Sequence, residues 1–182
     1  MSYELIVQYC SPTLAGLKIG SLFSYAAESE EALQSLVQAR NAALNPKGIY
    51  FTVLRHRNGR ALIYVYRKNQ LENVLKNPEI RAFLRSMGYH SFTWQDCRSM
   101  LMHHLSRQDF PHEIGIFLGY PLADIKGFIQ HKGANYKLVG CWKVYSDEKQ
   151  AKSLFDSYSK CTRIYETQLA HGTDITQLTV AV

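Results

Sequence analysis

The sequence predicts an α+β protein in which a small, mostly antiparallel sheet with one Asn-Gly hairpin packs against about six helices. Residues 49–57 and 61–67 are rich in β-branched and aromatic residues and flank Asn58-Gly59, a pair preferred in type I′ turns because both residues tolerate positive φ. The helical patterns cluster along the chain instead of alternating with strands, which favours α+β. With 182 residues, of which 46% are hydrophobic, the chain is expected to form one domain over 1–182.

The first quarter of the chain predicts a strand followed by a long helix. Residues 3–9 (YELIVQY) predict the strand, and the break at Cys10–Thr13 ends it. Residues 13–25 follow as a short helix or an ordered loop. Ser29 then caps a helix, because acids that favour the positive helix end follow it directly, and Asn45–Gly48 stops this helix.

The rest of the chain is mainly helical, with capping residues and apolar residues at helical spacing. The predicted helices cover about 69–76 from an Asn69/Glu72 capping box, 78–88 with Pro78 at its first position, 93–108, two segments within 112–132, and a long helix capped by Ser146-Asp147-Glu148. Residues 136–145 predict a strand that is buried at its centre. The tail from Asp174 predicts a final edge strand.

Charge and hydropathy narrow the classes of function. The net charge of +6 permits contact with nucleic acid or anionic ligands without requiring it. Three arginines of the Asn-Gly hairpin, Arg55, Arg57 and Arg60, form a weak candidate anion patch. No run approaches the ~20 apolar residues of a membrane span, and the first residues lack the pattern of a signal peptide. We therefore expect a cytoplasmic protein without a membrane partner.

Cysteines and histidines show no metal-binding motif. None of the four cysteines belongs to a CxxC pair, so free thiols are expected: Cys10, Cys97, Cys141 and Cys161. One group could converge on a metal if the turn before Pro111 folded back: His103, His104, Asp109, His112 and Glu113. It contains no HExxH motif, and the chain has no P-loop or G-x-G-x-x-G. We predict no metal site and assign no cofactor.

Four segments carry a resemblance to a known family. They are CSPTLAGLKIGSLF (10–23), PEIRAFLRSMGY (78–89), FPHEIGIFLGYPLADIKGFI (110–129) and NYKLVGCWKVY (135–145). Over almost its whole length the chain resembles the uncharacterised bacterial domain-of-unknown-function family 3793 (DUF3793), to which the F-P-H-E-I-G-x-F-L-G-Y-P block is specific. The resemblance implies one domain of about this size. It assigns no activity, so it transfers no catalytic role to any residue.

The leading interpretation is a binding module for a small or anionic ligand. The 10–18 segment and His112-Glu113 are polar breaks flanked by apolar runs, where binding residues often lie on a rigid scaffold. Lys143 lies in a predicted strand, and a lysine that faces a cleft holds anions, although a solvent-facing lysine is the commoner case. The candidate ligand-binding residues are Cys10, Lys18, His112, Glu113 and Lys143.

The second interpretation is a DNA-binding or regulatory protein with a helix-turn-helix-like unit at 112–132. Gly115, Gly119 and Ile125 have the spacing of the small packing residue, the turn glycine and the buried aliphatic residue of that motif. Readers of the major groove usually carry Arg, Asn or Gln toward base edges. Gly127 weakens the second helix by up to about 1 kcal/mol relative to alanine. Nucleic acid is therefore a partner that the sequence permits but does not favour.

The third interpretation is a cysteine-dependent hydrolase or transferase. A Cys10 thiol near a helix N-terminus and a basic Lys18 or His112 would have a lowered pKa, with His112 as its base and Glu113 as an orienting group. Adjacent residues on a helix diverge by about 100°, so these two rarely serve one atom. A small buried hydrophobic Cys10 is the simpler interpretation, and we expect no activated nucleophile at this position.

Overall fold

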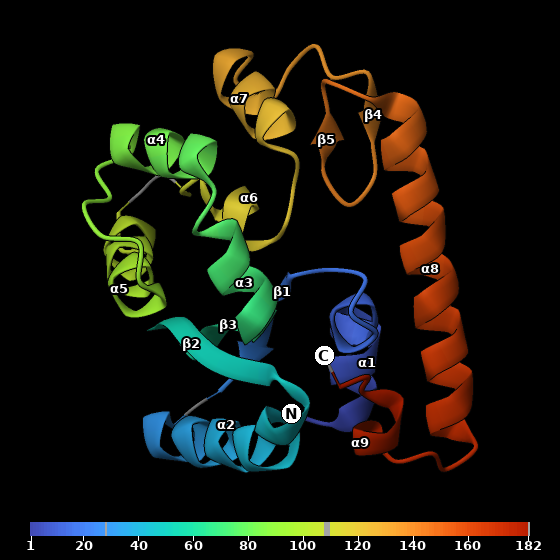
Figure 1. Cartoon of the computed structure of the whole chain (residues 1–182). Helices are drawn as coiled ribbons and strands as arrows, with labels where there is room; N and C mark the ends of the chain where they lie inside the picture. Colours follow the sequence, from blue (N-terminus) through green and yellow to red (C-terminus); the bar gives the residue numbers. More distant parts are fainter. Residues whose placement is uncertain (28, 108–109, 182) are drawn as a thin grey trace.

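A three-stranded antiparallel sheet lies at the centre of the molecule, with helices on both of its faces, and the protein is α+β as the sequence predicts (Figure 1). The computed structural model describes residues 1–27, 29–107 and 110–181. The middle strand is β3 (Arg60–Arg67), which pairs with β1 (Gly20–Ala26) on one side and with β2 (Ile49–Arg57) on the other.

The sheet separates two hydrophobic cores because side chains alternate along its strands. Ala61, Ile63 and Val65 of β3 face the core that α1 and α2 cover, whereas Tyr64 and Tyr66 face the core under α3 to α7. The helices are α1 (Tyr3–Leu14), α2 (Glu30–Leu44), α3 (Lys68–Val74), α4 (Pro78–Ser86), α5 (Trp94–Leu105), α6 (Ile114–Phe117), α7 (Leu122–Gln130), α8 (Glu148–Ala170) and α9 (Ile175–Leu178). Within the described residues, no helix combines the length and the apolar character needed to cross a bilayer.

Several local predictions are confirmed. Asn58 and Gly59 both have positive φ, 52° and 68°, and join β2 to β3 as the Asn-Gly pair predicts. Ser29 caps α2 by accepting a hydrogen bond from the Ala32 amide, and Asn77 caps α4, which has a proline in its first turn. Short polar side chains therefore mark these helix starts correctly.

The predicted strand at residues 3–9 is wrong, because this segment is the first part of α1. Ser2 caps the helix, and Ile6, Val7, Cys10 and Leu14 place one apolar face completely in the core. Pro12 does not end the helix. It lies in the last turn, where a proline removes only the hydrogen bond to the carbonyl of the exposed residue Gln8.

The strand β1 falls where a short helix or an ordered loop is predicted, and its neighbour β3 explains the difference. Seven residues of β1 pair with seven of β3, from Gly20 opposite Tyr66 to Ala26 opposite Arg60. A Cβ atom at Gly20 would lie 2.5 Å from the Tyr64 ring, so this position accepts only glycine. Long-range pairing therefore overrides a local sequence that carries little strand signal.

Two further strand predictions need correction. The segment 136–145 forms only a short hairpin, in which β4 (Leu138–Val139) pairs with β5 (Lys143–Val144). The tail from Asp174 forms the one-turn helix α9, because the Asp174 side chain accepts a hydrogen bond from the Thr176 amide and so caps it. After α9 the described residues, up to Ala181, join no strand, and the Val180 amide donates to the Leu14 carbonyl at the end of α1.

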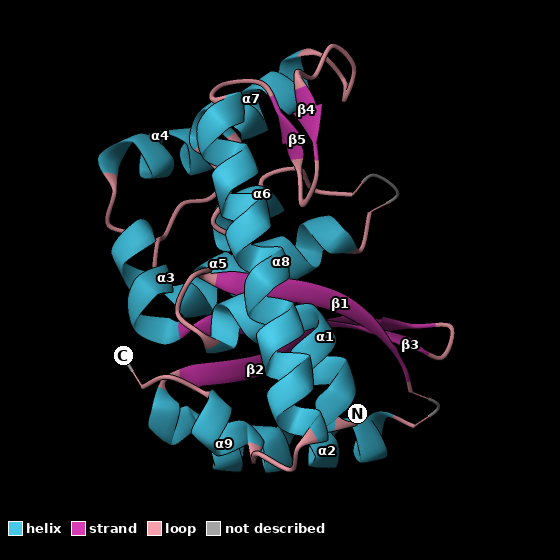
Figure 2. Ribbon diagram, turned by 90° about the vertical axis from the view of Figure 1, so that its right-hand side faces the viewer, coloured by secondary structure: helices cyan, strands magenta, loops and turns pink. Residues whose placement is uncertain are grey.

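The long helix α8 lies alongside α1 and connects the short hairpin to α9 (Figures 1 and 2). Its buried face includes Tyr158 and Cys161. The buried Arg67 side chain fixes the C-terminal segment near α1, since its guanidinium donates to the Thr13 carbonyl at 2.6 Å and to the Val180 carbonyl at 2.9 Å. A single side chain therefore connects the sheet to both segments.

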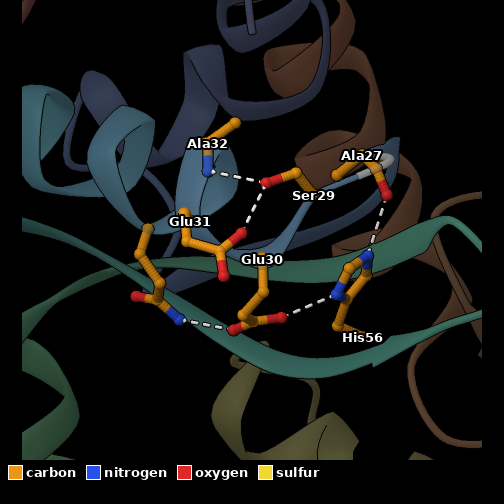
Figure 3. A network of polar contacts seen from close by, with 7 residues as sticks. Ala27, Ser29, Glu30, Glu31, Ala32 and His56 are labelled. Atoms are coloured by element: carbon orange, nitrogen blue, oxygen red, sulfur yellow. Dashed lines mark hydrogen bonds and ion pairs between the residues drawn. The ribbon is translucent and has the colours of Figure 1, made fainter.

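A polar network joins the end of the Asn-Gly hairpin to the start of α2 (Figure 3). One ring nitrogen of His56 lies 2.8 Å from the Ala27 carbonyl, and the other lies 2.6 Å from the Glu30 carboxylate. The Ala27 carbonyl, followed by Glu30, raises the pKa of His56 above its usual value. Hydrogen bonds from Gln34 and His56 lower the pKa of Glu30.

This network predicts a defined pH window. A raised histidine pKa adds stability below about pH 6.5, the unfolded value, and that stability is lost as the pH rises through the folded value. A lowered glutamate pKa adds stability above about pH 4.3, which is lost on acidification. We expect Glu30→Gln to lower the His56 pKa only in part, because the Ala27 carbonyl stays. NMR titration of the imidazole measures this. Glu31→Gln, which changes a carboxylate bound to Ser29 instead, should leave the value unaltered.

Candidate functional site

A cavity of about 340 Å³, which we call the aromatic cavity, opens between the segment before α6, the helix α7 and the short hairpin. Its walls are mainly apolar and aromatic, and its polar side chains come from a histidine, an aspartate and a lysine. The lining residues are Phe110, His112, Ile114, Gly115, Tyr120, Asp124, Ile125, Phe128, Val139, Gly140, Trp142 and Lys143. Ligand sites of small molecules have this form, a concave apolar surface with a few polar groups.

Asp124 holds the two sides of this cavity together. Its carboxylate, on α7, accepts hydrogen bonds from the Trp142 indole at 2.7 Å and from the Tyr145 and Ser146 amides at 2.8 Å each, and also from the Ser146 hydroxyl. Burial by itself raises the pKa of this carboxyl, but the hydrogen bonds outweigh burial and place the net pKa below its usual value. Asp124 is therefore an ionised structural anchor whose acceptor sites are already used.

Aromatic contacts position the hairpin against α7 and α8. The Tyr120 and Trp142 rings stack with centroids 4.9 Å apart, and the Trp142 ring meets Phe155 of α8 edge-on at 4.6 Å. Two glycines permit this close approach. A Cβ atom at Gly127 would lie 2.6 Å from Tyr145, and one at Gly140 would lie 2.3 Å from the Phe155 ring. The cavity walls are consequently fixed by packing on three sides.

Lys143 places a cation beside the aromatic walls. Its ammonium donates to the Gly133 carbonyl at 2.7 Å and lies 4.8 Å from the centre of the Tyr136 ring and 5.7 Å from that of Phe128. Within the described part of the chain it forms no salt bridge. An ammonium has three donors, so two hydrogens of Lys143 stay available to a ligand. The exposed ring of His112 lies against Phe128, with centroids 4.8 Å apart.

Glu113 belongs to a different, buried cluster. Its carboxylate lies 2.5 Å from Nδ1 of His104 and accepts a hydrogen bond from the Tyr89 hydroxyl at 3.2 Å. Burial and the nearby Glu113 raise the pKa of Tyr89, which stays protonated. His104 and Glu113 line a wider depression that also includes His112. His112 therefore faces both sites, whereas its neighbour Glu113 points inward.

Cys10 and Lys18, which the sequence groups with His112 as candidate ligand-binding residues, lie outside the aromatic cavity. The Cys10 side chain is fully buried in the core beneath α1, and burial raises the pKa of its thiol to about 12. Lys18 lies in the turn after α1. It lines a cavity together with Cys141 of the short hairpin and Tyr158 of α8. The five candidate residues thus separate into the core, two cavities and one buried cluster.

The structure places the arginine patch and the metal candidates as follows. Arg55, Arg57 and Arg60 are exposed at the end of the Asn-Gly hairpin, where Arg55 donates to the Leu105 carbonyl and Arg60 to the Ser24 hydroxyl. Over residues 1–27, 29–107 and 110–181, no three His, Cys, Asp or Glu side chains are grouped as a metal site. Asp109 of the predicted group lies outside the described residues.

The 112–132 unit consists of two helices, but the first is a single turn. All four residues of α6 are buried, and Ile125 of α7 packs so closely on Gly115 that a Cβ atom there would lie 2.9 Å from it. The exposed side of α7 carries Ala123, Lys126 and Gln130. The close packing of Gly115 and Ile125 agrees with their motif spacing, whereas the length of α6 differs from the helix predicted from His112.

Sequence reasoning missed most of the residues that build the aromatic cavity. The chemistry of the sequence singles out His112 and Lys143, but no ligand-binding role is assigned to Tyr120, Asp124 or Trp142 from the sequence. One signal was available: in the segment Leu122–Ile129, which is apolar apart from Asp124 and Lys126, an aspartate that packs inward must find hydrogen-bond partners. Its partners lie 18 to 22 residues later, which no local pattern specifies.

Comparison with known families gives one match. The family model described as "Protein of unknown function (DUF3793)" matches residues 6–179, which is nearly the whole chain. No curated protein and no solved structure matches the chain. The geometry described above is therefore the basis for a functional proposal.

Proposed function

Because the chain belongs to the DUF3793 family of proteins of unknown function, we propose a function from the geometry of the aromatic cavity: the protein binds a small apolar monoanion, such as an aromatic carboxylate. The observation that carries this proposal is the Lys143 ammonium, which is held by the Gly133 carbonyl beside apolar walls. An aromatic ring would fill the cavity, and its carboxylate would accept hydrogen bonds from Lys143. His112 would lie at the same opening.

The proposal predicts that tight binding needs both the negative charge and the aromatic ring of the ligand. With Trp94→Phe, Trp142 of the cavity wall is the only tryptophan left, so its fluorescence reports binding directly. We expect 4-ethylbenzoate to quench this fluorescence saturably, and the neutral 4-ethylbenzyl alcohol to bind at least about fivefold more weakly. Lys143→Gln should weaken benzoate binding about tenfold, equivalent to about 1.4 kcal/mol, with little effect on the alcohol.

Lys126→Gln is the matched control, since Lys126 is an exposed lysine of α7 outside the cavity lining. It should bind benzoate as the parent does. Equal affinity for acid and alcohol, or unchanged benzoate binding by Lys143→Gln, would refute the role of the cation. No saturable quenching by either compound would refute the cavity as a ligand site.

The helix-turn-helix interpretation stays the alternative function. The close packing of Gly115 on Ile125 favours it, because this contact allows the two helices of such a unit to approach each other. Against it, the exposed side of α7 offers one cation, Lys126, to a phosphate backbone. Binding to random duplex DNA that weakens steeply with salt would move this alternative ahead. A cysteine enzyme based on Cys10 ranks last, since a thiol with a pKa of about 12 is protonated at neutral pH.

A further inference from the structure

A second cavity, the Lys18 cavity, lies between α1, α8 and the short hairpin and has a volume of about 380 Å³. It neighbours the aromatic cavity through Tyr120, whose ring lines that cavity and has the Lys18 ammonium 5.4 Å from its centroid. Consecutive residues of the hairpin divide between the two: Cys141 lines the Lys18 cavity and Trp142 lines the aromatic cavity. The lining residues are Gln8, Tyr9, Pro12, Lys18, Ser21, Cys141, Tyr158, Ser159, Thr162 and Arg163.

The chemical character of this lining differs from that of the aromatic cavity. It combines two cations, Lys18 and Arg163, with the hydroxyls of serine, threonine and tyrosine residues from α1, β1 and α8. None of these ten residues is an aspartate or a glutamate. A concave surface that has positive charge and hydroxyl donors but no carboxylate among its lining residues is suited to an oxyanion, because both cations and hydroxyls donate to oxygen.

Lys18 is the central group of this surface. Its side chain is half-buried at the base of the turn after α1, and within the described part of the chain neither Lys18 nor Arg163 forms a salt bridge. Removing an ammonium from water without a counter-charge is unfavourable. Burial accordingly lowers the pKa of Lys18, although the nearby Cys141 and Cys10 thiols act in the opposite direction. An anion in the cavity would supply the missing counter-charge.

We propose that the Lys18 cavity binds a phosphate dianion, either free or as the ester of a small molecule, through Lys18 and Arg163. The two cations come from the turn after α1 and from α8, so the anion would bridge two elements that already pack together. The hydroxyls of Ser159 and Thr162 on α8 supply further donors around it. This site is separate from the proposed carboxylate site and depends on different lysines.

Cys141 provides a reporter inside the cavity. It is the one exposed cysteine, since Cys10, Cys97 and Cys161 are buried. Partial burial raises the pKa of the Cys141 thiol, and the Lys18 charge acts in the opposite direction. A bound phosphate would neutralise that charge and cover the thiol. We expect phosphate, compared with chloride at equal ionic strength, to slow the reaction of Cys141 with the neutral reagent iodoacetamide saturably, by about fivefold or more.

Two variants and one control test whether Lys18 and Arg163 bind the phosphate. Lys18→Gln and Arg163→Gln should each weaken the phosphate effect about tenfold, and Arg163 is exposed, so its variant keeps the fold even if Lys18→Gln does not. Lys143→Gln should retain the full effect, which separates this site from the aromatic cavity. Comparing inorganic phosphate with glycerol 3-phosphate distinguishes a free anion from an ester. A rate of Cys141 alkylation that phosphate leaves unchanged, or that it slows equally in Arg163→Gln, would overturn the proposal.

Discussion

Replacing Asp124 with alanine is expected to lower the free energy of unfolding by about 4 kcal/mol, the largest effect among the substitutions proposed for this protein. The buried carboxylate accepts four hydrogen bonds, from the Trp142 indole, the Tyr145 amide and the amide and hydroxyl of Ser146. Hydrogen bonds to a charged group contribute roughly 1.5–3 kcal/mol each, and donors left unpaired in a buried site add to the loss. The expected loss of about 4 kcal/mol is smaller than the sum of these four contributions, because in the variant the hairpin can move and expose the unpaired donors to water.

Thermal unfolding followed by circular dichroism measures this effect, and a loss of about 4 kcal/mol corresponds to a fall in Tm on the order of 10 °C for a chain of this length. The stability of Asp124→Asn should lie between those of the parent protein and Asp124→Ala, because its amide nitrogen faces the donor of either Trp142 or Ser146 and cannot accept a hydrogen bond from it. Asp156→Ala, at an exposed position of α8, should change stability by less than about 0.5 kcal/mol. A similar small change for Asp124→Ala would show that the hairpin is not anchored by this carboxylate.

The same anchor predicts a response to acid. The folded pKa of Asp124 lies below its unfolded value of about 3.9, so its contribution is complete above that pH and is lost as the pH falls through the folded value. Binding of any ligand in the aromatic cavity should be lost over the same range, because Trp142 forms part of its wall.

Replacing Glu113 with alanine is expected to destabilise the protein by about 3 kcal/mol, the second largest effect. The side chain is only 5% exposed, and its removal leaves the Tyr89 hydroxyl and His104 Nδ1 without their shared acceptor as well as a small cavity. A buried donor that is left without an acceptor costs roughly 1–3 kcal/mol, and two donors are affected here. The lower end applies because the side chain of His104 is 14% exposed and can turn toward solvent.

Urea unfolding gives the free energy directly, and the near-ultraviolet signal of Tyr89 should weaken in the same variant. Glu113→Gln keeps one acceptor for Tyr89 and should lose less than half as much stability as Glu113→Ala. Glu166→Ala, an exposed change on α8, serves as the matched control. A loss below about 1 kcal/mol for Glu113→Ala would contradict the structural role of the cluster.

Elements with strong local signals were predictable from the sequence. The Asn58-Gly59 turn, the cap at Ser29 and Pro78 in the first turn of its helix depend on residues within four positions of one another, and all three are confirmed. The prediction for the α1 segment was wrong because Ile6 and Val7 favour a strand. The apolar face of the helix becomes clear only when Cys10 and Leu14, on either side of Pro12, are included. The proline was given too much weight as a terminator.

The candidate site was predictable only in part, for a geometric reason. His112 and Lys143 were selected for their chemistry, and the structure brings both to one cavity. Lys18 was selected on the same grounds, but it lines the neighbouring Lys18 cavity together with Arg163. Its ammonium lies near the Tyr120 ring, which is part of the wall of the aromatic cavity. Which cavity a polar residue enters depends on the packing of α8 and the hairpin, and the spacing of residues along the chain does not encode that packing.

The pairing of α1 with α8 has a consequence for how the protein is made. The apolar face of α1 emerges from the ribosome early, but one of the helices that cover it begins only at Glu148 and the Val180 contact comes later still. At typical rates of translation the nascent chain waits on the order of ten seconds for these last contacts. Ile6, Val7 and Leu14 share their core with Ile175 and Leu178 of α9, so this core is completed only after α9 has been made.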